Sequence, residues 1–342
     1  MRHCKIGEVM IKTTTNTKLR PFSFDDAQAC VDLFNACSQK LFGWDDATLD
    51  DLMSEWTSPG IDVEETIRVV ENRQGDIIGY IDVWDNTKPH VIKYVWGVLH
   101  PDAWDEMLYH QMLAWAEKTA LSRVKLAPDG ARVIMQQGTS SKDIPRKGAL
   151  EDFGFELVRH FYRMQIDLED QPLQPTVPDG ISIVPIEMET ERQDAILAMH
   201  EAFKDHWGHV DTPADELLSQ WDHFIENDKD FDPTLWFLAK DGEQIAGTCR
   251  CSNKLAEDPE MGWVNQLCVG KSWRRRGLGM ALLLTAFAEF YQRGKQRVGL
   301  GVDASSLTNA TRLYEKAGMH ISQQYDTYVK VLRPGKDWTT AG

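Results

Sequence analysis

A loop near residue 275 carries side chains suited to holding phosphate groups. It contains three consecutive arginines and two glycines, namely Arg274, Arg275, Arg276, Gly277 and Gly279. Arginine provides a permanent charge and a fork of hydrogen-bond donors, and glycine lets a ligand approach the backbone closely. The chemistry that this combination predicts is the binding of a pyrophosphate or another small anion.

The segments on either side of the loop strengthen this interpretation. Residues 263–269 are apolar and β-branched, which is typical of a strand. After the loop, apolar side chains recur at helical spacing at Met280, Leu283, Leu284, Phe287 and Tyr291. The first N–H groups of a helix have no internal partner, and the helix dipole favours an anion there. The alternative is a solvated basic surface that only balances nearby acids.

Composition limits the classes of protein to be considered. The chain has 342 residues, 42% hydrophobic content and 12 tryptophans, enough for two domains with substantial cores. Its formal net charge of −16 argues against a general binder of nucleic acid or anionic membranes. An arginine cluster in so acidic a chain is better explained by one small anionic ligand.

The cysteines indicate neither a zinc site nor a disulfide framework. None of the six forms a Cys-x-x-Cys pair with a second pair downstream: Cys4, Cys30, Cys37, Cys249, Cys251 and Cys268. Cys249 and Cys251 are two apart in a strand-like run, so both should point to one buried face. We therefore expect no metal, a reducing cytoplasmic environment, and, in residues 1–17, a flexible extension rather than a signal peptide or membrane span.

The order of predicted elements repeats along the chain. Each half reads as a strand, two helices, a hairpin, a strand, a helix, a strand, a helix and a closing pair of strands. The expected strands are 18–21, 66–71, 77–83, 91–98, 131–136 and 154–167 (one or two strands), then 181–184, 235–239, 244–251, 263–269, 297–302 and 320–332. The expected helices are 24–38, 48–56, 103–120 and 142–152, then 189–203, 213–226, 278–291 and 307–316. This predicts an α/β (α+β) protein with two domains, residues 18–168 and 181–333, a linker at 169–180 and a tail at 334–342. Each domain should have a mixed, mostly antiparallel sheet flanked by helices.

A second motif follows the arginine loop by about forty residues. Ala310, Leu313 and Tyr314 share one face of a predicted helix that Gly318 ends. Together with Arg274-x-x-Gly277-x-Gly279, this resembles the acyl-CoA site of the GNAT N-acetyltransferase superfamily. The tandem layout, in which only the second half carries both motifs, is similar to mycothiol synthase-like acetyltransferases.

The resemblance implies acetyl-CoA as cosubstrate and assigns roles in its binding. Leu267, Cys268 and Val269 would pair with the pantetheine arm, and one of their N–H groups would polarise the thioester carbonyl. The pyrophosphate would receive the backbone amides of Arg275, Arg276, Gly277, Leu278, Gly279 and Met280. The 3′-phosphate would lie within reach of Lys271, Arg274 or Arg276, and Asn309 and Arg312 complete the expected cofactor-binding set.

Catalytic roles are only partly implied. Tyr314 would protonate the departing thiolate, because a phenol is a proton donor that stays neutral at pH 7; the alternative is that it only packs. Family members often carry a glutamate base on the strand before the loop, where this chain has Trp263 and Asn265.

The base therefore stays open among several groups. We retain Asn265 and Glu260 as catalytic candidates beside Tyr314. The other candidates are Asp303, His206, His209, His223 and a chain of water molecules.

The first half departs from the phosphate-binding pattern. Its corresponding loop, residues 100–105, reads His-Pro-Asp-Ala-Trp-Asp, without Gly-x-Gly or arginine. Two acids in that place oppose an anion. We expect this domain not to bind CoA in the usual way, and to wall off part of the substrate cleft of the second domain.

The acceptor is the least readable part of the site. His206, Trp207 and Trp221 fall where related folds line an acceptor pocket, and Asp205 and Asp222 beside them would suit a cationic amine. The alternative is that they are core tryptophans and solvent-facing histidines. We expect acetyl transfer to the amine of a small molecule by direct attack in a ternary complex, by a monomer or homodimer that engages neither nucleic acid nor membrane. Alternatives are a longer acyl group, a hydroxyl acceptor, or a non-catalytic acyl-CoA-binding regulator.

Overall fold

The structure is a computed structural model that describes residues 17–58, 61–85, 88–255, 258–306 and 309–340. The expected N-terminal extension, apart from its last residue, lies outside the described residues. Within the described part of the chain, no helix combines the length and apolar character needed to cross a membrane.

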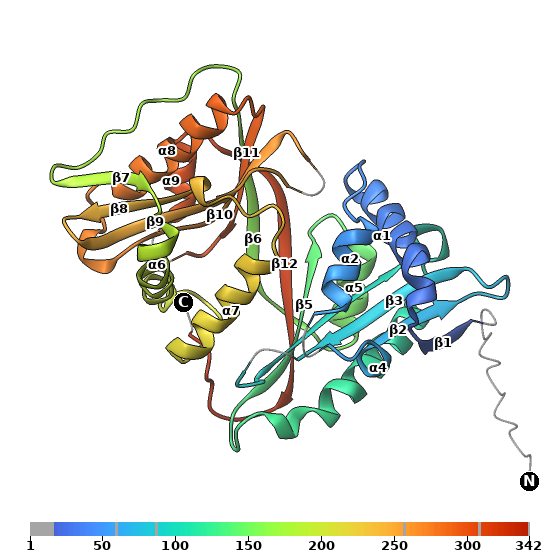
Figure 1. The fold of residues 1–342 in the computed structure, drawn as a ribbon. Coiled ribbons are helices and arrows are strands. Elements are labelled where there is room, and N and C mark those ends of the chain that lie inside the picture. The colour runs from blue at the N-terminus through green and yellow to red at the C-terminus, as the bar shows by residue number, and fades with distance from the viewer. Residues whose placement is uncertain (1–16, 59–60, 86–87, 256–257, 307–308, 341–342) are drawn as a thin grey trace, which may run out of the picture.

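One continuous sheet of twelve strands runs through the molecule (Figure 1). Its order is β1-β2-β3-β4-β5-β12-β6-β11-β10-β9-β8-β7. The pairs β4–β5 and β10–β11 are parallel, and the other neighbouring pairs are antiparallel. The prediction of a mixed, mostly antiparallel sheet is confirmed.

The first half supplies the strands β1 (Lys18–Pro21), β2 (Ile67–Glu71), β3 (Ile77–Trp84), β4 (Ile92–Leu99), β5 (Val133–Ser140) and β6 (Glu156–Asp167). Its helices are α1 (Ala27–Leu41), α2 (Leu49–Trp56), α3 (Val63–Thr66), α4 (Glu106–Ser122) and α5 (Ile144–Asp152), with 3-10 turns η1 (Phe24–Asp26), η2 (Pro101–Ala103) and η3 (Val124–Leu126). Helix starts follow local capping chemistry, as at α2, where the hydroxyl of Thr48 accepts a hydrogen bond from the N–H of Asp51.

The second half supplies β7 (Ile181–Pro185), β8 (Trp236–Asp241), β9 (Gln244–Ser252), β10 (Met261–Val269), β11 (Arg297–Asp303) and β12 (His320–Arg333). Its helices are α6 (Met188–Phe203), α7 (Ala214–Asn227), α8 (Leu278–Gln292) and α9 (Ala310–Lys316), with 3-10 turns η4 (Pro233–Leu235) and η5 (Lys271–Trp273). The predicted hairpin turns are present: Gly75 and Gly242 have φ of +90° and +59° between β2 and β3 and between β8 and β9.

The two halves exchange their last strands. β12, the last strand of the chain, lies between β5 and β6, and β6 pairs on its other side with β11. The cores are exchanged in the same way, because Met164 on β6 is buried in the core cluster around α8, and Tyr328 on β12 in the cluster around α4. The expectation of a closing strand pair in each half was wrong. Each half ends in one long strand, and the neighbour that completes the sheet comes from the other half.

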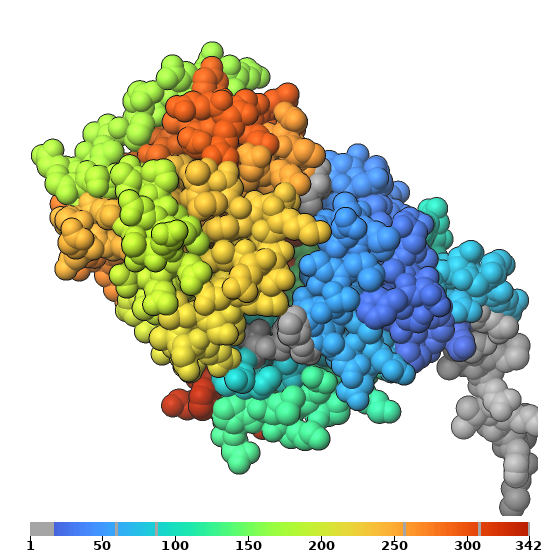
Figure 2. All heavy atoms as spheres, viewed as in Figure 1, coloured from blue at the N-terminus to red at the C-terminus, as the bar shows by residue number. Residues whose placement is uncertain are grey.

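Helices cover both faces of the sheet, as predicted. In the second half, α8 packs against one face through Leu283, Phe287 and Phe290, and α6 covers the other through Ile196 and Met199. In Figure 2 the second half, green to orange, meets the first half, blue to cyan, along a seam. Leu283, Leu284 and Phe287 of the predicted apolar face are buried, but the buried surface of α8 also includes Leu282, Ala286 and Phe290, and Tyr291 is 38% exposed.

Candidate active site

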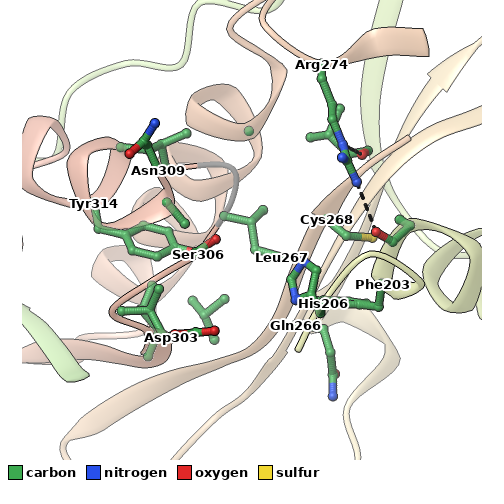
Figure 3. A pocket seen from close by; sticks show the side chains of 18 of the residues that line it. Phe203, His206, Gln266, Leu267, Cys268, Arg274, Asp303, Ser306, Asn309 and Tyr314 are labelled. Atoms are coloured by element: carbon green, nitrogen blue, oxygen red, sulfur yellow. Dashed lines mark hydrogen bonds between the residues drawn. The ribbon is translucent and has the colours of Figure 1, made fainter. Parts of the chain in front are cut away.

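A cavity of about 750 Å³ opens in the second half of the sheet. It lies between the ends of β10 and β11, the start of α8, helix α9 and the segment after α6. The arginine loop, the strand before it and the helix that carries Tyr314 thus meet at one place (Figure 3).

The two central strands separate beside this cavity. β10 and β11 pair only from Met261 opposite Arg297 to Val264 opposite Leu300. Beyond this point β10 continues to Val269 with β9 as its ladder partner, after an irregularity in register between Val264 and Gln266. Beyond Val264, the edge of β10 toward the cavity therefore has no described strand as a ladder partner, and an extended chain with amide groups can add there as a strand.

The loop before α8 leaves a helix N-terminus open. Arg275 and Gly277 adopt φ of +63° and +85°, the left-handed region, and none of the described side chains caps α8. A Cβ at Gly277 would have no atom of the described residues within 4 Å, so none of them fills the space beside it. The N–H groups at the start of α8 are thus available to an anion. Arg275, Gly277, Leu278 and Gly279 line the cavity.

Arg274 is engaged differently from the other arginines. Its guanidinium donates to Asp205 at 2.6 and 3.3 Å and to the carbonyl oxygens of Ala202 and Val269 at 3.0 and 3.1 Å. The dashed line in Figure 3 marks the 2.6 Å hydrogen bond from Arg274 to Asp205. Arg274 therefore anchors the arginine loop before α8 to the end of α6, a structural role that the sequence did not predict.

Tyr314 points into the cavity from α9 (Figure 3). The residue is 7% exposed, and its hydroxyl makes no hydrogen bond to another described residue. Burial, with a smaller contribution from Cys249, raises the pKa of the Tyr314 phenol well above its ordinary value. The phenol therefore stays protonated at neutral pH and is free to donate.

His206 faces the cavity from the opposite wall (Figure 3). Neither ring nitrogen bonds to a described side chain, and the ring packs edge-on against Phe203 with centroids 4.5 Å apart. Partial desolvation lowers the pKa of His206 below its usual value, although Asp205 and Asp303 act in the other direction. The imidazole is therefore neutral at pH 7 and able to accept a proton.

Part of the cavity wall comes from the first half. Arg159 and Phe161 on β6 line the cavity. Arg159 lies over the Trp207 ring, 5.4 Å from its centroid, and its Nε donates to Asp303 at 3.1 Å. The first half thus supplies part of the wall of this cavity, and its role in a substrate cleft stays a prediction. These two residues escaped sequence reasoning, because no local pattern reveals that β6 pairs with β11.

Two further residues of β10 contribute in different ways. Asn265 lines the cavity, but its Oδ1 accepts a hydrogen bond from the hydroxyl of Ser252 at 2.8 Å. Cys268 also lines the cavity, and burial raises the pKa of its thiol to about 12. The thiol is thus not a ready nucleophile at neutral pH.

Several predicted residues lie outside this cavity. Glu260 is exposed at the other end of β10, before Met261, so the geometry gives it no part in proton transfer. Trp221 instead packs on Trp236 and Arg250. The remaining predicted residues that do not line the cavity are Lys271, Arg276, Met280, Arg312, His209 and His223.

A small polar group lies near the segment after α6. His200, His209 and Asp211 place their ligand-type atoms within 4.8 Å of one another. His200 already pairs with Asp211 at 3.3 Å, a contact that partly exposed histidines and aspartates make without a metal. Nothing in the chemistry of the main cavity requires an ion there.

The first half lacks the open helix N-terminus. Its corresponding helix is α4, and Asp105 caps it by accepting a hydrogen bond from the N–H of Leu108 at 3.0 Å. A carboxylate thus occupies the place where α8 leaves room for an anion.

Comparisons with known proteins agree with this geometry. Residues 196–319 match the model of the Acetyltransferase (GNAT) family. The crystal structure of a GCN5-related N-acetyltransferase from Sphaerobacter thermophilus is 30% identical with a TM-score of 0.78, covering 94% of this chain and 97% of that one. A tandem GNAT protein from the clavulanic acid biosynthesis pathway shares the fold at 14% identity, with a TM-score of 0.68 over 94% of this chain and 100% of that one.

A relative by sequence points to the same family. The mycothiol acetyltransferase of Nocardiopsis dassonvillei is 29% identical over 233 residues, which are 61% of this chain and 67% of that protein. The chain belongs to the GNAT family of N-acetyltransferases, with two GNAT-type halves in tandem.

Proposed function

We propose that this protein transfers the acetyl group of acetyl-CoA to the amine of a small molecule, by direct attack in a ternary complex. The observation that carries the proposal is the open edge of β10, which leads directly to the uncapped N-terminus of α8. A peptide-like arm followed by a pyrophosphate has this shape and this order of chemical groups. Acetyl-CoA would supply an acetyl group activated as a thioester.

The residues around the cavity fit this cosubstrate. Residues 265–269 offer backbone groups to the amides of the arm, and an N–H there polarises the thioester carbonyl. The start of α8 receives the pyrophosphate, and the exposed side chains of Lys271, Arg275 and Arg276 surround the same loop and attract the remaining phosphate. Arg274, held by Asp205, keeps the loop in place.

Proton transfer is assigned to the two walls of the cavity. The acceptor attacks as a neutral amine, and the neutral imidazole of His206 takes the proton that its nitrogen loses as the C–N bond forms. Asp303 lies near enough to stabilise the resulting imidazolium charge. On the other wall, Tyr314 donates its proton to the sulfur as the C–S bond breaks. Exchange with solvent restores both groups after each turnover.

Direct attack is favoured over an acetylated enzyme. A covalent route needs an activated nucleophile in the cavity, and Cys268 is held as a neutral thiol. The acceptor wall includes Trp207, Phe161 and Asp303, with Arg159 bound to Asp303 and lying over the Trp207 ring. Its aromatic surface suits an acceptor with an apolar body. The five described cysteines are free and buried, which supports action in a reducing compartment such as the cytoplasm.

The test is release of CoA thiol from acetyl-CoA across a panel of small amines, with the matched alcohols as controls. We expect turnover with at least one amine, with the acetyl group recovered on its nitrogen by mass spectrometry. Turnover with alcohols rather than amines would show that the acceptor in the proposal is wrong. Turnover only with longer acyl-CoA thioesters would show that the acyl donor is wrong. Tight CoA binding by calorimetry with no turnover on any acceptor would identify a regulator instead.

A further inference from the structure

A second cavity, of about 660 Å³, lies in the first half of the molecule. It is formed by β3, β4 and β5 together with α1, α2 and α5. Tyr325 on β12 also lines it, so the second half closes this cavity as β6 closes the other. Nothing in the proposed transferase reaction uses it.

Eight aromatic rings line this cavity. The lining rings are Phe34, Phe42, Trp56, Tyr80, Trp84, Tyr94, Trp96 and Tyr325. Phe34 packs edge-on against both Tyr80 and Trp96, with centroids 4.9 and 4.7 Å apart, which fixes these rings in place. Faces of aromatic rings carry partial negative charge and attract organic cations.

A carboxylate without a cation lies among these rings. Asp82 is 5% exposed; its oxygens accept hydrogen bonds from the Tyr80 hydroxyl at 3.0 Å and the Trp96 N–H at 3.1 Å. The Tyr80 hydroxyl in turn accepts from Trp56 Nε1 at 3.0 Å. Across the described residues, no lysine, arginine or histidine pairs with Asp82. Burial raises the pKa of Asp82 to about 7, as expected of a carboxyl that lacks a positive partner.

Two buried hydroxyls in the same lining also lack partners. Ser38 and Thr139 are 3% and 4% exposed, and neither side-chain oxygen has a hydrogen-bond partner among the described residues. A buried hydroxyl without a hydrogen-bond partner destabilises the fold. Such groups are therefore expected where a ligand completes the hydrogen bonding.

The charge of the lining favours a cation. Its charged side chains are Asp46, Glu55, Asp82 and Arg146. Arg146 is already paired with Asp143 at 2.9 Å, so its charge is balanced from outside the lining. Asp82 and Glu55 thus exceed the positive charge that the lining supplies to them. An acyl-CoA is excluded as the occupant, because the capped α4 and the His-Pro-Asp loop offer no phosphate site.

We propose that the cavity of the first half is a second small-molecule site, which binds an organic ammonium compound against Asp82 and the aromatic walls. The ammonium group lies beside the carboxylate and the ring faces, and hydroxyls of the ligand meet Ser38 and Thr139. This inference does not depend on the proposed transfer reaction, because it needs only binding.

The test is calorimetric titration of the full chain with two cation probes and their neutral analogues. Choline is paired with 3,3-dimethylbutan-1-ol, and 2-phenylethylamine with 2-phenylethanol. Saturating CoA is present throughout. We expect at least one cation to bind at least tenfold more tightly than its analogue, and Asp82→Asn to abolish that difference. The matched control Asp129→Asn, an exposed aspartate in the same half, should change nothing.

A third variant assigns the binding to a cavity. Trp207→Ala alters the wall of the active-site cavity and should leave this binding intact. Should Asp82→Asn fail to fold by circular dichroism, Tyr94→Ala serves instead, since Tyr94 is 41% exposed at the lining and its loss should weaken binding severalfold. The proposal would be overturned by no preference for either cation, by a preference that survives Asp82→Asn, by undiminished cation binding in Tyr94→Ala, or by a preference that disappears in Trp207→Ala.

Discussion

In the proposed reaction, Tyr314 and His206 divide the proton transfers between two walls of one cavity. The pKa of Tyr314 is raised, which suits a proton donor, and the pKa of His206 is lowered, which suits a proton acceptor. Burial keeps the Tyr314 phenol protonated, while desolvation keeps the His206 imidazole neutral. An acid and a base are thus both in their working forms at neutral pH.

Tyr314→Phe keeps the ring and its packing and removes only the proton donor. General acid catalysis is worth about 10²–10⁴-fold, so turnover should fall by that order. Affinity for CoA should change little, because the hydroxyl acts mainly in the transition state. Single-turnover thiol release measures the chemical step. If the variant keeps nearly the parental turnover while the chemical step limits the rate, Tyr314 contributes only packing and is not the proton donor.

His206→Gln tests the base through the pH profile. The parent rate should fall as pH drops through the pKa of His206, which lies below its usual value of 6.5, because protonation removes the acceptor. The variant should be slower by about 10²-fold or more and should lose this acid limb. His223→Gln, which changes a histidine outside the cavity, is the matched control. An unchanged acid limb in His206→Gln would assign the base to Asp303 or to water.

At the scale of elements, sequence patterns predicted what each segment does but not which strands are neighbours. The loop, the strand before it and Tyr314 could be read from local spacing, because each signal lies within a few residues. The strand exchange could not, since β6 and β12 have the same alternating pattern whichever partner they take. Arg159, Phe161 and Tyr325 enter the two cavities through that exchange. The assignment of Glu260 as a catalytic candidate failed for a similar reason. Its closeness to β10 in the sequence did not reveal which end of that strand faces the cavity.

The N-terminus of α8 gives a prediction at this scale. Gly277→Asp should place a carboxylate against the pyrophosphate and weaken CoA binding by more than tenfold, about 1.4 kcal/mol. Gly75→Asp is a matched control, since Gly75 also has a positive φ and open space around its Cβ position, but lies in a turn of the first half. Calorimetry measures both variants. Unchanged affinity in a folded Gly277→Asp protein would show that the loop does not contact the pyrophosphate.

At the scale of the molecule, the exchanged strands should make the two halves unfold together. β12 completes the sheet of the first half and β6 that of the second, so neither half retains its core alone. Denaturation by urea should show one transition, with coincident midpoints by circular dichroism and tryptophan fluorescence. Tyr328→Ala, which removes a buried ring from the core of the first half, should lower that single midpoint. Two separate transitions would show that each half is stable without its exchanged strand.

The most direct test of the central claim is a crystal structure of the protein soaked with acetyl-CoA. The account predicts one acetyl-CoA per chain, with the pantetheine arm along residues 265–269 of β10 and the pyrophosphate at the start of α8. The thioester should lie between Tyr314 and His206. Acetyl-CoA in the first half, two molecules per chain, or a thioester remote from Tyr314 and His206 would contradict it.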